Sequence, residues 1–173
     1  PTNPLWTRMV IPHPADEWPR AALDDACQAL DAQGMQMDCE NLQLGGASAA
    51  WDGSCAPHLV RELSRAAWAV VFYGSDGAVT QVVRGPVWDS LPQTSQSAEH
   101  VGLAACEQIV AFPTQLYGDC MNVVRAHAAP FATQRGRKAR YAGVRRVALC
   151  EKARPSAISG VEYVKAHRSN EAI

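Results

Sequence analysis

The sequence predicts an α/β domain in which a mixed, five-stranded sheet is flanked by helices. Three observations predict it: short alternating apolar runs within residues 47–84, apolar residues at helical spacing between residues 94 and 110, and two later strand-like runs. With 173 residues, 47% of them hydrophobic, the chain can bury a core. The expected order β-β-β-α-β-α-α-β allows the first and fourth strands to lie side by side and parallel.

The first three strands are predicted to form an antiparallel meander. Gly45-Gly46 introduces a strand over 47–55, and the run Ala-Ala-Trp-Ala-Val-Val-Phe-Tyr predicts a second over 66–73. The turn Gly-Ser-Asp-Gly at 74–77 then leads into an alternating return strand over 78–84.

A helix is expected from the capping residues at 94–97 to Val110. Within it Glu99, Leu103, Cys106 and Val110 recur on one stripe, which directs the Glu99 carboxylate toward the packed face. Such a placement is unusual for a glutamate.

The remainder should contain a strand over 114–117, a helix beginning at Asp119, a long basic helix over 133–153 and a last strand over 158–166. Pro155 ends the basic helix. Its apolar side is expected to consist of Tyr141, Val144 and Leu149.

Residues 1–44 are interpreted as an N-terminal extension, partly helical, ahead of a domain spanning 45–173. Pro19 suits a first helical turn, and Leu23, Cys27 and Leu30 continue at helical spacing until Gly34.

Charge is distributed unevenly along the chain although the net charge is only −1. Residues 1–124 carry 5 basic and 14 acidic side chains, whereas residues 125–168 carry 11 basic and 2 acidic ones. The later segment is therefore a candidate surface for a polyanion, the alternative being a solvated helix face.

Composition also argues against several classes of protein. The six cysteines contain no Cys-x-x-Cys pair, which favours reduced, partly buried thiols over a disulfide framework or a zinc site. No apolar run reaches the roughly 20 residues that span a bilayer, and the start lacks a signal peptide pattern. We expect an intracellular protein, cytoplasmic or nuclear, with no membrane partner.

Three carboxylates stand where a strand ends or a helix begins: Asp52 in Trp-Asp-Gly-Ser, Glu99 in Ala-Glu-His and Asp119 in Gly-Asp-Cys. At one edge of a sheet they would form a site for a hard divalent cation. Each has a simpler alternative when taken alone: a turn for Asp52, a helix cap for Asp119 and a favourable helix dipole for Glu99.

Taken jointly, these motifs resemble a ribonuclease H domain of the kind found in retroelement reverse-transcriptase polyproteins. The resemblance covers residues 46–173 and includes Lys165-Ala-His167 and Asn170-Glu171 near the end. It implies an RNase H-like fold in which Asp52, Glu99 and Asp119 are catalytic metal ligands for Mg²⁺ or Mn²⁺. Two ions about 3.5–4 Å apart would then promote hydrolysis of the RNA strand of an RNA/DNA hybrid. His167 matches the histidine that is thought to assist proton transfer or product release.

The resemblance also implies a nucleic-acid interface and a reverse-transcriptase domain as a possible partner in the same polyprotein. Backbone amides of Gly53 and Ser54 and the side chains of Gln96 and Asn122 are candidate contacts to RNA. The basic handle is assigned to Arg137, Lys138, Arg140, Arg145 and Arg146.

One departure from the family pattern concerns the fourth carboxylate. It would fall at position 174, one past Ile173, so we expect a domain cut short before its last helix, as a piece of a longer polyprotein. The alternative function is a degenerate RNase H-like fold that serves as a structural or nucleic-acid-binding module without catalysis. A thiol hydrolase based on Cys120 and His127 is disfavoured, because no oxyanion hole or orienting acid can be identified.

Overall fold

The computed structural model describes residues 27–39, 42–56, 58–59, 64–88, 90–130, 133, 141–145 and 157–165. The strands are β1 (Gln28–Asp31), β2 (Gln36–Met37), β3 (Ser48–Ala56), β4 (Arg65–Tyr73), β5 (Val79–Pro86), β6 (Thr114–Gly118) and β7 (Ile158–Tyr163). The two longer described helices are α3 (Ser95–Ile109) and α4 (Met121–Ala128).

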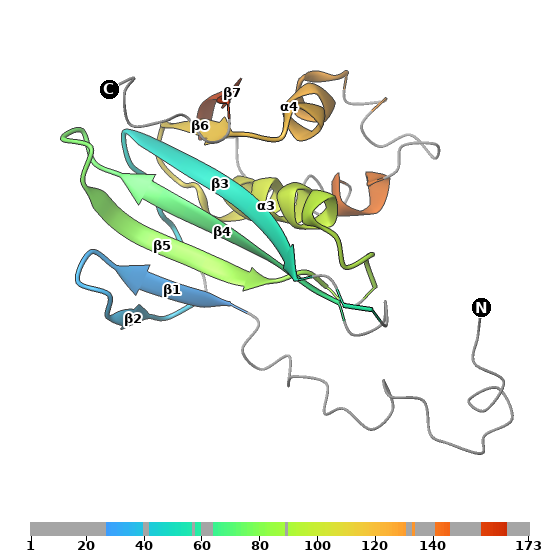
Figure 1. The fold of residues 1–173 in the computed structure, drawn as a ribbon. Coiled ribbons are helices and arrows are strands. Elements are labelled where there is room, and N and C mark those ends of the chain that lie inside the picture. Colours follow the sequence, from blue (N-terminus) through green and yellow to red (C-terminus); the bar gives the residue numbers. More distant parts are fainter. Residues whose placement is uncertain are drawn as a thin grey trace, which may run out of the picture.

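These strands form a seven-stranded sheet in the order β2-β1-β5-β4-β3-β6-β7 among the described residues (Figure 1). Strands β3, β4 and β5 are the predicted antiparallel meander. Strand β6 pairs parallel with β3 and with β7. The mixed α/β sheet with flanking helices is thus confirmed, and β1 and β2 extend it beyond the five expected strands.

The core lies between one face of the sheet and α3 (Figure 1). The strand registers align a row of residues that crosses five strands: Ala29, Val83, Val70, Trp51 and Gly118. All of these are buried because side chains alternate across a strand and this row faces the helix. Helix α3 begins as predicted, with the Thr94 side chain accepting a hydrogen bond from the Ser97 amide at 3.1 Å.

The predicted stripe on α3 is confirmed. Leu103, Cys106 and Val110 are buried, and Glu99 is only 5% exposed. Every residue from Ser97 to Glu107 is buried, so this part of the helix is covered on all sides and not only along the predicted stripe.

The central parallel pair is held in register by Trp51 and Gly118, which lie directly opposite each other. The Trp51 ring occupies the space that a Cβ atom at position 118 would need. A side chain at position 118 would therefore displace the largest group between β3 and α3.

The helix predicted to run from Pro19 through Leu30 is wrong over its described part. Residues 28–31 form strand β1, which pairs antiparallel with β5 along Gln28–Arg84 through Asp31–Gln81. The edge of β5 offers hydrogen-bond partners to the backbone of residues 28–31, and Ala29 becomes buried there. These tertiary contacts stabilise the strand more than the helical spacing of three apolar residues stabilises a helix. Residues 19–26 lie outside the described part of the chain.

Two other boundaries differ from the expected ones. Helix α4 begins at Met121 with Cys120 as its cap, so Asp119 precedes the helix and does not cap it. The last strand ends at Tyr163, three residues earlier than expected. Of the predicted basic helix, only residues 133 and 141–145 are described; 142–145 are helical, and the predicted apolar positions Tyr141 and Val144 are buried.

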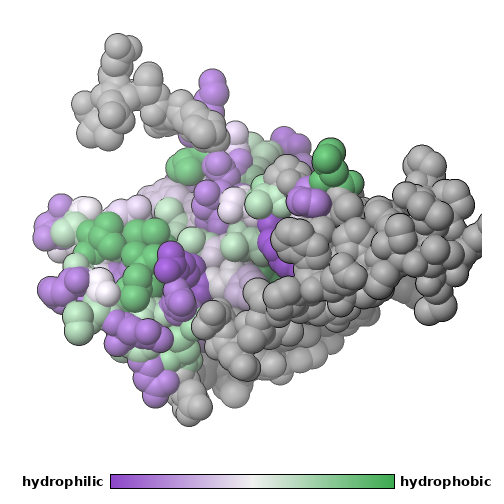
Figure 2. Space-filling view, turned by 60° about the horizontal axis from the view of Figure 1, so that its bottom comes forward, coloured by the Kyte–Doolittle hydropathy of each residue, from purple (hydrophilic) through white to green (hydrophobic). Residues whose placement is uncertain are grey.

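The outer surface carries exposed apolar side chains from several different elements, including Met35, Val79 and Phe112. Figure 2 shows hydrophobic groups interspersed with hydrophilic ones on one side of the molecule. Within the ranges that the structure describes, no helix is long and apolar enough to cross a bilayer.

Replacing Gly118 with alanine tests the packing of Trp51. We expect Gly118→Ala to lower the free energy of unfolding by about 1–3 kcal/mol, because the added methyl group overpacks the Trp51 ring. Gly143→Ala is the matched control, since a Cβ there meets nothing within 4 Å. Urea denaturation followed by tryptophan fluorescence measures both; equal stability of the two variants would contradict the role given to Gly118.

Candidate metal centre

Three carboxylates from separate parts of the chain meet where the pairing of β3 with β6 ends. Asp52 lies in β3, Glu99 in the first turns of α3, and Asp119 between β6 and α4. One oxygen atom of each lies within 4.8 Å of the others. Asp52 is exposed, Asp119 is half-buried and Glu99 is buried, so the cluster connects the core to the surface.

The register of the parallel pair explains why the two aspartates meet. Pairing between β3 and β6 ends at Trp51 and Gly118, and the residue that follows each of them along the chain is an aspartate. Strand β3 continues to Ala56 whereas β6 ends at Gly118, so the parallel register sets Asp52 beside Asp119 where their pairing ends. This is the arrangement expected from the sequence.

Gly53 brings the third carboxylate to the same place. Its amide donates to Asp52 Oδ1 at 2.7 Å and to Glu99 Oε1 at 3.1 Å. A Cβ atom at position 53 would lie 2.8 Å from the Ala98 Cβ and still closer to the backbone of α3. Only a glycine therefore lets the first turn of α3 approach β3 closely enough for Glu99 to reach this amide.

The electrostatics of the cluster resist full ionisation when no cation is present. Burial raises the pKa of Glu99 to about 8, and repulsion by Asp119 and Asp52 adds to this, while the hydrogen bond from Gly53 opposes it. Glu99 Oε2 is buried without a hydrogen-bond partner. A buried carboxylate oxygen without a partner, beside two further carboxylates, is what a bound cation would satisfy.

The donor set fits a hard divalent cation. Carboxylate oxygens are the ligands that Mg²⁺ and Mn²⁺ prefer, and the exposed Asp52 leaves the site open to solvent. Asp52, Glu99 and Asp119 could hold such an ion, and its charge would offset the repulsion among them.

The predicted RNA contacts lie in elements that adjoin the cluster. Ser54 is exposed in β3, Gln96 is half-buried in the first turn of α3, and Asn122 is exposed in α4. The Gly53 amide, in contrast, already donates to two carboxylates. The remaining predicted residues, Arg137, Lys138, Arg140, Arg146 and His167, lie outside the described residues, as do Asn170 and Glu171.

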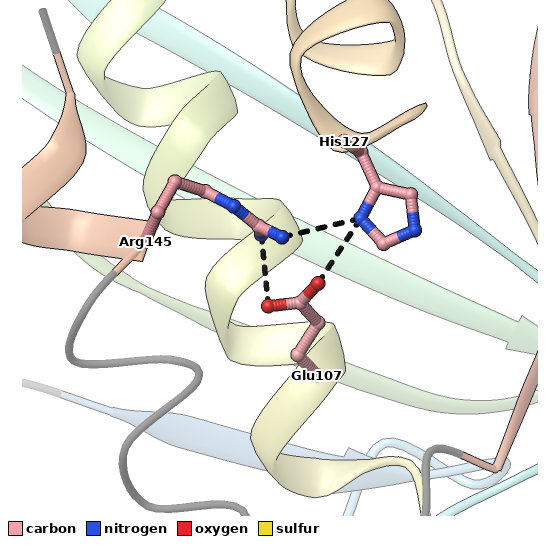
Figure 3. Close-up of polar contacts among 3 residues, drawn as sticks. All are labelled: Glu107, His127 and Arg145. Atoms are coloured by element: carbon pink, nitrogen blue, oxygen red, sulfur yellow. Dashed lines mark hydrogen bonds and ion pairs between the residues drawn. The ribbon is translucent and has the colours of Figure 1, made fainter. Parts of the chain in front are cut away.

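The placement of Arg145 on an exposed basic face is wrong. Arg145 is 3% exposed, and its Nη1 donates to Glu107 Oε2 at 2.8 Å. The imidazole Nδ1 of His127 lies 3.1 Å from Glu107 Oε1 and 3.3 Å from Arg145 Nη2 (Figure 3). A buried carboxylate needs a partner of opposite charge, and the ion pair with Glu107 keeps the Arg145 guanidinium buried.

The cluster of Glu107, His127 and Arg145 was missed by the sequence reasoning. It links α3, α4 and the segment 141–145 (Figure 3). One signal for it was available: Glu107 follows Glu99 by eight residues and Leu103 by four, so it belongs to the same buried stripe. The identity of its partners, 20 and 38 residues further along, had no local signal.

A second contact fixes the segment 141–145 on α3. The rings of Tyr141 and His100 stack with their centres 4.1 Å apart, and Ser97 Oγ lies 3.4 Å from the Tyr141 hydroxyl. Burial lowers the pKa of His100 to about 4, with a further contribution from the Arg145 charge, so the imidazole is neutral at pH 7. His100, the residue next to Glu99, is therefore held by ring stacking on Tyr141 rather than by an ion pair.

Comparison with known proteins identifies the fold. No protein family model matches the sequence, and no curated protein matches it. The solution structure of the PFV RNase H domain superposes with a TM-score of 0.54 at 19% identity, covering 72% of this chain and 81% of that one. RNase H1 from the halophilic archaeon Halobacterium salinarum NRC-1 also aligns, with a TM-score of 0.39 at 19% identity over 70% of this chain and 87% of that one.

The protein thus has an RNase H-like fold, established by the likeness to the PFV domain. At this edge of the fold stands a carboxylate cluster whose chemistry suits a divalent cation.

Glu99→Gln should stabilise the metal-free protein at neutral and alkaline pH. A folded-state pKa near 8, raised from an ordinary 4.5, means that the native state binds more protons than the unfolded chain between those values. Stability of the native chain therefore falls as pH rises from 4.5 to 8 and then levels off. The gain in melting temperature from Glu99→Gln should grow over the same window.

Glu107→Gln is the matched control on the same helix. It should lower stability at pH 7 by about 3 kcal/mol, because it leaves the Arg145 guanidinium buried without its counter-charge. Calorimetry between pH 5 and 9 in EDTA compares the variants. A Glu99→Gln protein less stable than the native chain at pH 8 would show that Glu99 is compensated by groups other than a cation.

Proposed function

We propose that the protein is a metal-dependent endonuclease that hydrolyses the RNA strand of RNA/DNA hybrids. The observation that carries this proposal is the convergence of Asp52, Glu99 and Asp119 within 4.8 Å on an RNase H-like fold. The PFV neighbour is itself an RNase H domain, which supports a retroelement origin and a reverse-transcriptase domain as partner. Such an enzyme would act inside the cell.

The three carboxylates would have different roles as metal ligands. Glu99, buried and fixed by the Gly53 amide, would be the rigid ligand at the inner side of the site. Asp52 and Asp119 lie nearer to solvent and would hold ions at the side where the substrate phosphate enters. Bound Mg²⁺ or Mn²⁺ supplies a polarised water nucleophile and charge stabilisation at the leaving oxygen.

Other residues would bind the hybrid and move protons. Ser54, Gln96 and Asn122 lie two or three residues along the chain from Asp52, Glu99 and Asp119 and would contact 2′-hydroxyl groups, which distinguish RNA from DNA. His167 would transfer protons or assist product release, since an imidazole side chain can both accept and donate a proton. Arg137, Lys138, Arg140 and Arg146 would contact phosphates.

Asp119→Asn should abolish cleavage without unfolding the protein. The amide removes one negative ligand and retains the size of the side chain, so we expect a loss of at least about 1000-fold in rate. A labelled RNA/DNA hybrid with Mg²⁺, with Mn²⁺ and with EDTA measures it, and calorimetric titration with Mn²⁺ reports metal binding directly. Asp52→Asn should behave in the same way.

Asp76→Asn is the matched control. Asp76 caps the β4–β5 turn by accepting a hydrogen bond from the Ala78 amide, and an asparagine oxygen can do the same. Cleavage by this variant should equal that of the native chain. Hybrid binding without metal-dependent cleavage by the native chain would contradict the enzyme and favour a nucleic-acid-binding module.

The joint replacement of Arg137, Lys138 and Arg140 by alanine should weaken hybrid binding in a salt-dependent way. If each neutralises one phosphate, the slope of log affinity against log salt becomes less steep by about 2–3. Fluorescence anisotropy of a labelled hybrid between 50 and 300 mM KCl, in EDTA, measures it. An unchanged slope would assign phosphate binding to other residues.

A further inference from the structure

Two half-buried cysteines flank the hairpin formed by β1 and β2. Cys27 immediately precedes β1, and Cys39 comes two residues after the end of β2. Both pack against the hydrophobic core from its margin, as Met37 does between them. The hairpin therefore carries a thiol at each of its two open ends.

The strand register, extended beyond the paired residues, would place these cysteines opposite each other. Ala29 pairs with Met37 and Leu30 with Gln36, and the Asp31 amide donates to the Met35 carbonyl at 2.9 Å. The same antiparallel register, carried two residues outward, sets Cys27 against Cys39. Residues opposite each other on antiparallel strands have Cα atoms about 4.5–5.5 Å apart, within the range of about 4.4–6.8 Å that a disulfide requires.

The side chains also point to the same face of the sheet. Cys27 is two residues from Ala29 and Cys39 two from Met37, so both share the core-facing side of the hairpin. The Cys39 thiol donates to the Cys27 carbonyl oxygen at 3.2 Å, which brings one sulfur onto the backbone of the other cysteine. Burial raises the pKa of Cys27 to about 11, and the neighbouring Cys39 thiol adds to this rise.

We propose that Cys27 and Cys39 form a reversible disulfide that locks β1 and β2 onto the edge of the sheet. The oxidant is a small-molecule disulfide of the glutathione type. A cysteine thiolate attacks one sulfur of this reagent, forming a mixed disulfide and releasing one reagent thiol. The second cysteine thiolate then attacks the protein-bound sulfur and releases the other thiol, so that the protein loses two protons and two electrons and the reagent gains them.

The lock would act on an element held by few contacts. Strand β2 comprises two residues and pairs only with β1 among the described strands, while β1 is joined to the sheet through β5. A covalent closure across the open ends of this hairpin restricts its local unfolding. It would also fix Gln28, whose Oε1 accepts a hydrogen bond from Arg84 Nε at 3.0 Å.

The test is oxidation of the folded protein by oxidised glutathione at pH 8.5, followed by intact mass spectrometry. We expect a mass loss of about 2 Da, reversed by a reducing agent, and amide exchange in residues 28–37 slowed by about tenfold. Cleavage by cyanogen bromide at Met35 and Met37 separates the two cysteines, and the fragments should stay joined until reduced.

Three serine variants assign the bond. Cys27→Ser and Cys39→Ser should each abolish the mass loss, whereas Cys55→Ser, which changes another half-buried cysteine, should retain it. Stable glutathione adducts without the mass loss, or the same loss in Cys39→Ser, would overturn the proposal. None of these outcomes depends on cleavage activity, so the disulfide and the proposed function stand or fall separately.

Discussion

The parallel pairing of β3 with β6 is the constraint on which the rest of the structure depends. Trp51 and Gly118 form its last pair, and the indole ring fills the space left by the missing side chain at position 118. A shift of one residue would turn Asp52 or Asp119 to the wrong face or withdraw it from the edge. The same pair also sets the depth at which α3 packs, because the ring lies against Gly102 of that helix.

The two buried glutamates of α3 show how the helix combines stability with a functional site. Glu107 has an arginine at 2.8 Å and a histidine at 3.1 Å, so a positive partner for it lies within the protein. Glu99, two turns earlier, faces two aspartates and keeps one oxygen without a partner. One helix thus holds a paired acid where it joins other elements and an uncompensated acid where the sheet ends. Such concentrated repulsion is typical of a site awaiting a positive charge.

The sequence was sufficient to predict structure wherever the contacts that determine it are local or follow a regular period. Alternation predicted the meander, the stripe on α3 predicted the burial of Glu99, and the end of the strand before Asp119 predicted an acid there, whereas Asp52 lies in the middle of β3. It was insufficient where the partner lay far away. Strand β1 looked helical because Leu23, Cys27 and Leu30 have helical spacing, yet an open edge at β5 determined its state. Nothing in the local sequence distinguishes Arg145 from the basic residues around it; its burial follows from the ion pair with Glu107, 38 residues earlier.

Arg145, one residue of the basic part of the sequence, is buried against α3. Tyr141 stacks on His100, the neighbour of Glu99, and Arg145 binds Glu107 on the same helix. Residues 141–145 are thereby anchored at two points to the helix that supplies the buried metal-ligand candidate. A polyanion approaching Asp52 and Asp119 would be repelled unless cations bound there first. Under the proposed function, a cation bound among the three carboxylates would remove that repulsion, so that metal and nucleic acid would favour each other's binding.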